Sequence, residues 1–189
     1  MKRDTKNKIS LAEPVRKTNW YVITGGPSSG KTTTVNLLAQ RGYKTTIEHA
    51  RHYIDTQRHI GRSVDDIRNH QKEFQLGVLD MQIEQEKEIA PDDVVFLDRA
   101  IPDAFAYYKF LNLEPDEKLL NAMKHVYYKK IFILEYLPLV NDYARTEDVV
   151  AQKKIHDVLT EVYASLPFPV IHVPVLPAAD RLEVILKNL

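Results

Sequence analysis

A glycine-rich segment near the start of the chain has the residue types and spacing of a phosphate-binding loop. The segment WYVITGGPSSGKTTTVNLL, residues 20–38, contains the pattern G-x-x-x-x-G-K-[ST]. Glycines let backbone N–H groups surround a polyphosphate, and a helix that starts near Gly30 adds the positive end of its dipole. We expect Lys31 to place its ammonium group between the β- and γ-phosphates, and the Thr32 hydroxyl to ligate Mg²⁺. The predicted nucleotide-binding residues of the loop are Gly25, Gly26, Pro27, Ser28, Ser29, Gly30, Lys31, Thr32 and Thr33.

The residues on either side of the loop have the composition that this pattern requires. The apolar, β-branched run 21–24 predicts a strand before the loop. Val35 and Leu38 follow the loop at helical spacing, and Gly42 marks the end of that helix. A serine-rich turn that binds nothing is the alternative, and the flanking elements favour the phosphate loop.

Acidic residues end three of the other predicted strands. The short strand-like run 44–47 and the apolar runs 94–97 and 131–134 are followed by Glu48, Asp98 and Glu135, respectively. Because the carboxyl ends of parallel strands meet at one edge of a sheet, we expect these side chains to converge near the loop.

Two of these carboxylates suit phosphoryl transfer. Asp98 is in the position to hold Mg²⁺, directly or through water, or to orient the attacking hydroxyl; capping of the next helix is its alternative role. Glu48 is the candidate general base, because the nucleophile needs a proton acceptor within hydrogen-bond reach. An exposed acid at a helix start is the alternative for Glu48.

Arginines supply candidate contacts to phosphate and base. Arg51 and Arg99 are predicted to bind substrate oxygens or transition-state charge, since a guanidinium fits phosphate bidentately; ordinary ion pairing is the alternative. Arg145 lies in the polar segment NDYART, and we expect that segment to close over the phosphates. Arg181 follows the last strand and is predicted to pack on the adenine base, with a plain surface position as the alternative for both.

Other polar residues give weaker signals. Gln75 and Gln82 lie on a predicted long helix, where they can read an amide or a base of the substrate. His49 and His52 are three apart, a spacing that metal pairs use, but no third ligand follows at a matching distance.

Composition narrows the class of protein. The chain has 189 residues, enough for one α/β domain, which we assign to residues 19–189 after a polar tail at 1–18. Lysine and arginine total 26, equal to aspartate and glutamate, so there is no basic surplus and a long nucleic acid is disfavoured as partner. There is no cysteine, no signal peptide and no run that could span a bilayer, so we expect a cytoplasmic protein without disulfides. The oligomeric state stays open.

Strands and helices alternate along the whole chain. The strand runs named above and the last one, 169–173, are separated by predicted helices, including one long helix from Ser63 to about Ala90. This alternation predicts a five-stranded parallel sheet between two layers of helices, with ligands at the carboxyl ends of the strands.

Several segments together resemble a known family. GGPSSGKTT, IEHARHYI, FLDRAIPDAFAY and NDYARTED, with a late Asp180-Arg181 pair, are similar to the NadR-type AAA domains, which include the ribosylnicotinamide kinase module of a bifunctional NAD regulator. The resemblance runs from about Trp20 to Leu186. It implies a three-layer P-loop NTPase with kinase-type strand order 2-3-1-4-5, ATP and Mg²⁺ as ligands, and an arginine-bearing lid matched by Arg145. The nucleotidyltransferase half of the bifunctional protein has no counterpart here, so the resemblance does not identify the substrate.

Three functions are compatible with these residues. The first is transfer of the γ-phosphoryl group of MgATP to a hydroxyl of a small, possibly nucleoside-like molecule, with Lys31, Glu48, Asp98 and Arg145 as catalytic residues. The second is a nucleotide-binding regulatory ATPase that acts through a protein or lipid partner. The third is phosphorylation of polynucleotide ends. The guanine signature N-K-x-D does not follow a suitable strand, which weakens a GTPase interpretation.

Overall fold

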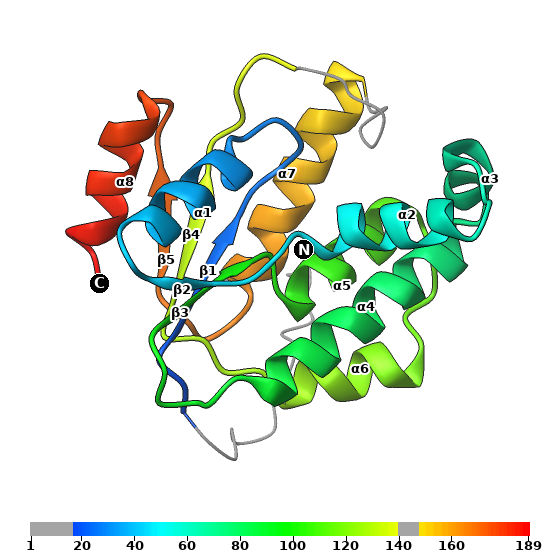
Figure 1. The fold of residues 1–189 in the computed structure, drawn as a ribbon, viewed down its shortest axis with the longest axis horizontal. Coiled ribbons are helices and arrows are strands. Elements are labelled where there is room, and N and C mark those ends of the chain that lie inside the picture. Colours follow the sequence, from blue (N-terminus) through cyan, green and yellow to red (C-terminus); the bar gives the residue numbers. More distant parts are fainter. Residues whose placement is uncertain (1–16, 140–147) are drawn as a thin grey trace, which may run out of the picture.

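Five parallel strands form a single sheet at the centre of the protein (Figure 1). The computed structural model describes residues 17–139 and 148–189. The order across the sheet is β2-β3-β1-β4-β5, so the predicted strand order is confirmed. The strands are β1 (Trp20–Thr24), β2 (Lys44–Thr45), β3 (Val95–Asp98), β4 (Lys130–Leu134) and β5 (Val170–Val173).

Helices cover both faces of the sheet, which gives three layers (Figure 1). Helices α1 and α8 pack on one face, and α5 and α7 pack together on the other. The helices are α1 (Lys31–Gln40), α2 (His49–His59), α3 (Val64–Asn69), α4 (Gln71–Glu88), α5 (Ile101–Phe110), α6 (Glu117–Lys124), α7 (Val149–Ala164) and α8 (Ala178–Leu186). In the described part of the chain, none of these helices is long and apolar enough to cross a bilayer.

The central strand shows why the sheet is buried on both sides. Alternate residues of a strand point to opposite faces. Tyr21 and Ile23 belong to the cluster under α1 and α8, whereas Trp20 and Val22 belong to the cluster under α5 and α7. All five residues of β1 are buried. The continuous apolar character of this strand is therefore a consequence of its double coverage.

The prediction of one long helix from Ser63 to about Ala90 is wrong in one respect, because the helix is broken at His70. This residue has φ −96° and ψ 57°, and α3 ends before it while α4 begins after it. The His70 ring Nδ1 lies 2.8 Å from the Asp66 carbonyl oxygen, which also accepts from the His70 backbone N–H at 3.3 Å. The side chain therefore competes with the helical backbone for the same oxygen, and the chain turns there.

Strand β2 is shorter than the predicted run 44–47, and a side chain takes over part of its pairing. The backbone N–H of Thr46 still donates to Phe96 O at 3.0 Å. The Thr46 hydroxyl then accepts from the backbone N–H of Asp98 at 2.8 Å. The chain leaves the sheet after this contact, and Glu48 follows as the N-cap of α2.

A third apolar cluster lies apart from the two sheet faces, where α2 and α3 pack on α4. It contains Tyr53, Ile54, Ile67, Phe74 and Val78. Tyr53 and Phe74 meet edge to face with ring centroids 5.6 Å apart. Helix α2 can approach α4 this closely because residue 77 is glycine.

We expect Gly77→Ala to destabilise the protein by about 1–2 kcal/mol, measured by urea unfolding. In a helix interior this change alone would stabilise by about 1 kcal/mol. An added Cβ, however, would lie 2.0 Å from Cε2 of the buried Tyr53 ring, so overpacking should outweigh propensity. In a Tyr53→Leu background the same change should no longer cost stability. A gain in the native background would show that the helices separate freely.

Candidate functional site: a phosphate loop beside an acidic and arginine-lined pocket

The glycine-rich loop between β1 and α1 has the conformation of an anion-binding turn. Gly25 and Gly30 have φ values of 144° and 78°, in the region that favours glycine. A Cβ at Gly25 would lie 2.5 Å from the Leu134 carbonyl oxygen, so the loop also needs glycine for space. Helix α1 starts directly at Lys31, and its first N–H groups have no partner within the helix.

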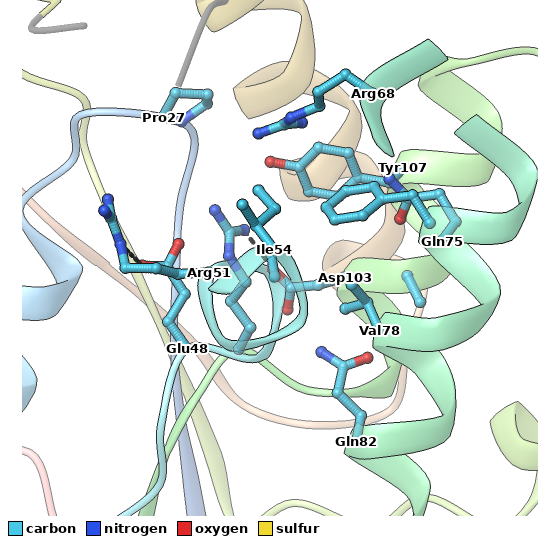
Figure 2. A pocket seen from close by; sticks show the side chains of 14 residues that line it. Pro27, Glu48, Arg51, Ile54, Arg68, Gln75, Val78, Gln82, Asp103 and Tyr107 are labelled. Atoms are coloured by element: carbon cyan, nitrogen blue, oxygen red, sulfur yellow. Dashed lines mark hydrogen bonds and ion pairs between the residues drawn. The ribbon is translucent and has the colours of Figure 1, made fainter. Parts of the chain in front are cut away.

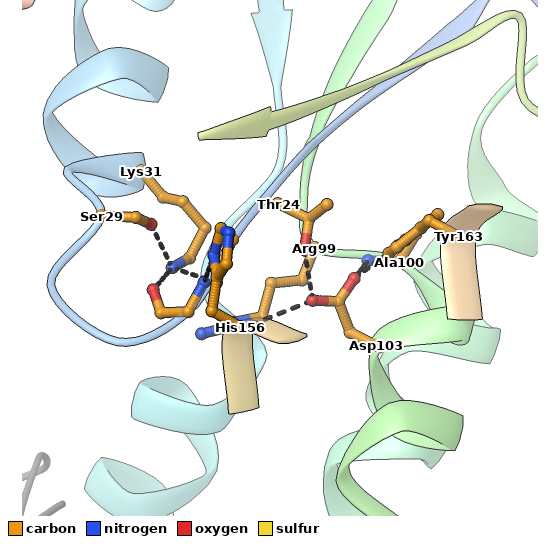
Figure 3. A network of polar contacts seen from close by, with 10 residues as sticks. Thr24, Ser29, Lys31, Arg99, Ala100, Asp103, His156 and Tyr163 are labelled. Carbon is orange, nitrogen blue, oxygen red and sulfur yellow. Dashed lines mark hydrogen bonds and ion pairs between the residues drawn. The ribbon is translucent and has the colours of Figure 1, made fainter. Parts of the chain in front are cut away.

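Lys31 holds the loop from the inside. Its side chain is buried, and its ammonium donates to the carbonyl oxygens of Gly25 and Gly26, both at 2.9 Å, and to Ser29 Oγ at 3.1 Å (Figure 3). A lysine placed this way adds a positive charge to the helix N-terminus and fixes the loop at the same time.

Other elements bind the loop backbone from the outside. Gln152 on α7 donates its amide to Pro27 O at 2.9 Å, and the Leu137 backbone N–H donates to Ser28 O at 2.9 Å. Arg181 on α8 donates to Ser29 O at 2.6 Å. These contacts satisfy successive loop carbonyls with framework donors. The same stretch of backbone can then offer its amides to an anion.

His156 adds a contact to a loop amide. Its Nδ1 accepts from the Gly26 backbone N–H at 3.4 Å, and its Nε2 lies 3.3 Å from a carboxylate oxygen of Glu135. Burial lowers the pKa of His156, partly offset by the charge of Glu135. A neutral ring is the form that can accept from Gly26.

Neither of the α7 residues that support the loop was predicted from the sequence. The buried face of α7 carries Gln152, Ile155, His156 and Leu159 at helical spacing. Two polar residues on an otherwise apolar helix face are a readable signal, because a buried polar group needs a partner.

The two predicted carboxylates lie close enough to influence each other. Asp98 is buried and Glu48 is half-buried at the N-cap of α2, so Glu48 is not the exposed acid of the alternative interpretation. Burial, and then the charge of Glu48, raises the pKa of Asp98 to about 6, against the opposing effect of Lys31. One buried oxygen of Asp98, Oδ1, has no hydrogen-bond partner among the described residues. Such an arrangement favours a bound cation.

Asp98 and Thr32 carry oxygen atoms of the kind that bind a magnesium ion. Carboxylate and hydroxyl oxygens are the donors that Mg²⁺ prefers, and it keeps several of its waters. Asp98 offers a buried oxygen, and Thr32 is exposed at the start of α1. The two predicted metal ligands are therefore of the right chemical type.

A pocket opens between the loop and helices α2, α4 and α5 (Figure 2). Three residues predicted to bind substrate, Glu48, Arg51 and Arg99, all line it. Arg51 Nε lies 3.7 Å from Glu48 Oε2. The far wall comes from α4, where Gln75 and Gln82 are buried, and from the rings of Phe74 and Tyr107. The remaining lining residues are Pro27, Ala50, Ile54, Arg68, Val78, Asp103 and Ala104.

Other predicted residues have different surroundings. Arg145 lies outside the described residues. Arg181 is buried and contacts Ser29 O and Leu176 O, so it supports the loop; its stacking on adenine stays a prediction. His49 Nε2 lies 2.8 Å from Gln85 Oε1, and within the ranges 17–139 and 148–189 no set of three metal-binding side chains is found.

Comparison with known proteins gives both a family and a fold. A family profile described as AAA domain matches residues 20–181. The NadR protein in complex with NR is 21% identical with a TM-score of 0.56; the match covers 82% of this chain and 45% of NadR, so the chain spans about half of that protein. Deoxyadenosine kinase from M. mycoides with bound dATP is 14% identical with a TM-score of 0.62, covering 89% and 98%. Thymidylate kinase from Ehrlichia chaffeensis is 16% identical with a TM-score of 0.60, covering 92% and 99%. No match was found among curated protein sequences.

We expect Asp98→Asn to stabilise the nucleotide- and metal-free protein. The pKa of Asp98 rises from 3.8 in the unfolded chain to about 6 in the folded protein. The folded protein therefore loses stability as pH increases between these two values. Above pH 6 the full cost is present, at most about 3 kcal/mol at 1.36 kcal/mol per pH unit. In thermal melts from pH 4 to 8, the melting temperature of the variant should rise relative to that of the native protein up to about pH 6. Above that pH the difference between the two melting temperatures should stay constant. Identical pH profiles would contradict this placement of Asp98.

We expect Lys31→Ala to lower nucleotide turnover by on the order of 10²–10³, by analogy with removing one preorganised donor. The matched control is Lys87→Ala, which removes a lysine that is 64% exposed on α4. Release of ADP measures turnover, and a native rate in Lys31→Ala would show that the ammonium group has no part in the reaction.

Proposed function

The chain belongs to the AAA domain family, and on that premise we propose that it transfers the γ-phosphoryl group of MgATP to a hydroxyl of a small, nucleoside-like molecule. The proposal depends on one observation, that the phosphate loop and a candidate catalytic carboxylate line the same pocket. Pro27 of the phosphate loop and Glu48 line the same pocket. A hydroxyl bound in that pocket meets the end of a triphosphate held by the loop, with a carboxylate beside both.

The reaction then needs few protein groups. The acceptor oxygen attacks the γ-phosphorus, the bond from that phosphorus to the β-γ bridging oxygen breaks, and ADP leaves. Glu48 accepts the hydroxyl proton. Lys31 and the amides at the start of α1 stabilise the charge on the phosphates. Asp98 and Thr32 would hold Mg²⁺, which when bound supplies positive charge against the negative charge of the phosphates.

The far end of the pocket supports a flat, nitrogen-containing acceptor. Phe74 and Tyr107 provide aromatic rings, and the guanidinium groups of Arg68 and Arg99 lie over them, 5.0 Å and 5.5 Å from the respective ring centres. Gln82 is 2% exposed, and its Oε1 has no hydrogen-bond partner among the described residues. A buried amide oxygen without a partner costs free energy, and an N–H donor on the acceptor would remove that cost. Gln75, two turns earlier on the same helix, is also buried in this wall.

The related structures are consistent with this class of acceptor. NadR was solved with NR, and the other two proteins are a deoxyadenosine kinase and a thymidylate kinase. Sequence identities of 14–21% support only a shared fold. The acceptor of this chain therefore has to be inferred from the residues of its own pocket.

A screen of ADP release tests the proposal directly. Nucleosides, nucleoside monophosphates, sugars, vitamins and short oligonucleotides are each added to protein with MgATP. We expect a nucleoside-like hydroxyl compound to raise turnover at least tenfold over the basal rate. A response to oligonucleotide ends alone would favour polynucleotide phosphorylation. Turnover raised only by a protein or a lipid vesicle would favour the regulatory ATPase and reject the kinase.

We expect Glu48→Gln to lower acceptor phosphorylation by on the order of 10²–10⁴ while MgATP affinity stays within about threefold. The amide keeps the shape of the side chain and removes the proton acceptor. Transfer rates and calorimetric titration with MgATP separate the two effects. Loss of nucleotide binding would place Glu48 in the metal site, and an unchanged transfer rate would exclude it as the base.

A further inference from the structure

One buried carboxylate joins the phosphate loop to the arginine of the pocket. Asp103, in the first turn of α5, is 1% exposed (Figure 3). Its Oδ1 accepts from the Thr24 hydroxyl at 2.7 Å and from the Arg99 guanidinium at 3.0 Å. Its Oδ2 accepts from the backbone N–H of Ala100 at 3.1 Å and from the Tyr163 hydroxyl.

The donors come from separate parts of the fold. Thr24 is the last residue of β1 and immediately precedes the loop glycine Gly25. Tyr163 lies near the end of α7, and Ala100 is the N-cap of α5. Asp103 is the N3 residue of α5, and capping requires only one of its oxygens: Oδ2 accepts from the N-cap backbone N–H, as the N3 glutamate of a capping box does. The second oxygen is shared by Thr24 and Arg99, and helix capping does not explain it.

Arg99 is held in an unusual conformation. Its φ is 68°, a region that costs free energy for a residue with a side chain. Its side chain is 9% exposed, and its guanidinium lies 5.5 Å from the centre of the Tyr107 ring. Left to itself, an arginine side chain samples many rotamers. The Asp103 ion pair and the Tyr107 ring restrict it to one.

We infer that Asp103 is a positioning residue, which fixes the Arg99 guanidinium relative to the first glycine of the phosphate loop. The inference rests on the proposed function in one respect: it takes Arg99, which lines the pocket and is predicted to bind substrate oxygens, as a contact of the acceptor. Through Oδ1, one atom sets the distance between the end of β1 and the guanidinium. Phosphoryl transfer depends on such distances, because a misplacement of about 1 Å can cost on the order of 10²-fold in rate.

A double-mutant cycle between Asp103 and Arg99 separates positioning from general stabilisation. Asp103→Asn should lower kcat/KM for the most active acceptor of the screen by on the order of 10–100-fold, with MgADP affinity within threefold of native. In an Arg99→Ala background, Asp103→Asn should have less than a threefold further effect. The matched control is Tyr163→Phe, which removes another donor from the same carboxylate and should leave kcat/KM within threefold. If the losses in kcat/KM of the two single variants were additive, or if Tyr163→Phe lost as much kcat/KM as Asp103→Asn, Asp103 would have only a structural role.

A second measurement needs no acceptor. In the native protein with MgADP, nuclear magnetic resonance should detect slowly exchanging guanidinium protons of Arg99, assigned by their loss in Arg99→Lys. These signals should persist in Tyr163→Phe and disappear in Asp103→Asn, or in Asp103→Ser should the asparagine variant not fold. Failure of the acceptor screen would reject the proposed function alone. Absence of the protected signals from the native protein would overturn the positioning role.

Discussion

Much of this structure follows from one requirement of the phosphate loop, that its carbonyl oxygens find donors other than the ligand. A backbone segment that offers N–H groups to an anion has to turn its carbonyls elsewhere, and buried carbonyls without partners are costly. Lys31 takes two of them, and Gln152, Leu137 and Arg181 take the next three. Helices α7 and α8 are thus held beside the loop by hydrogen bonds as well as by apolar packing.

The buried charged residues of the site lower the stability of the unliganded protein. Asp98 is buried near Glu48, and both effects raise its pKa. A neutral side chain of the same shape would suit the unliganded protein better. Active sites commonly carry such groups, because a charge that is unfavourable alone is stabilised once its ligand is present. Arg99, with positive φ and a buried guanidinium, adds to the same local cost.

Much of the fold was predictable from short-range patterns. The alternation of apolar runs with helical spacing predicts a parallel α/β sheet. The strand order was implied by the resemblance of the sequence to the NadR-type AAA domains. That resemblance is confirmed by the family match over residues 20–181 and by the shared fold of NadR. The break at His70 was missed because it depends on a side chain competing for a backbone oxygen, which periodicity does not record.

The candidate site was most predictable where residues belong to the loop motif or follow a strand end. Glu48, Asp98 and Arg99 could be placed because parallel strands end at one edge. Asp103 could not be placed, and Gln152 and His156 were readable only as polar residues on an apolar helix face, not as partners of the loop. Their importance depends on contacts with β1 and the loop that are made across 79 to 130 residues of sequence. The separate packing of Tyr53, Ile54, Ile67, Phe74 and Val78 has an evolutionary consequence. This cluster shares no residue with either sheet core, although Leu79 on another face of α4 belongs to the core under α5 and α7. Substitutions within the cluster can therefore accumulate in evolution and reshape the pocket wall formed by α2 and α4, while the packing beneath the phosphate loop stays intact.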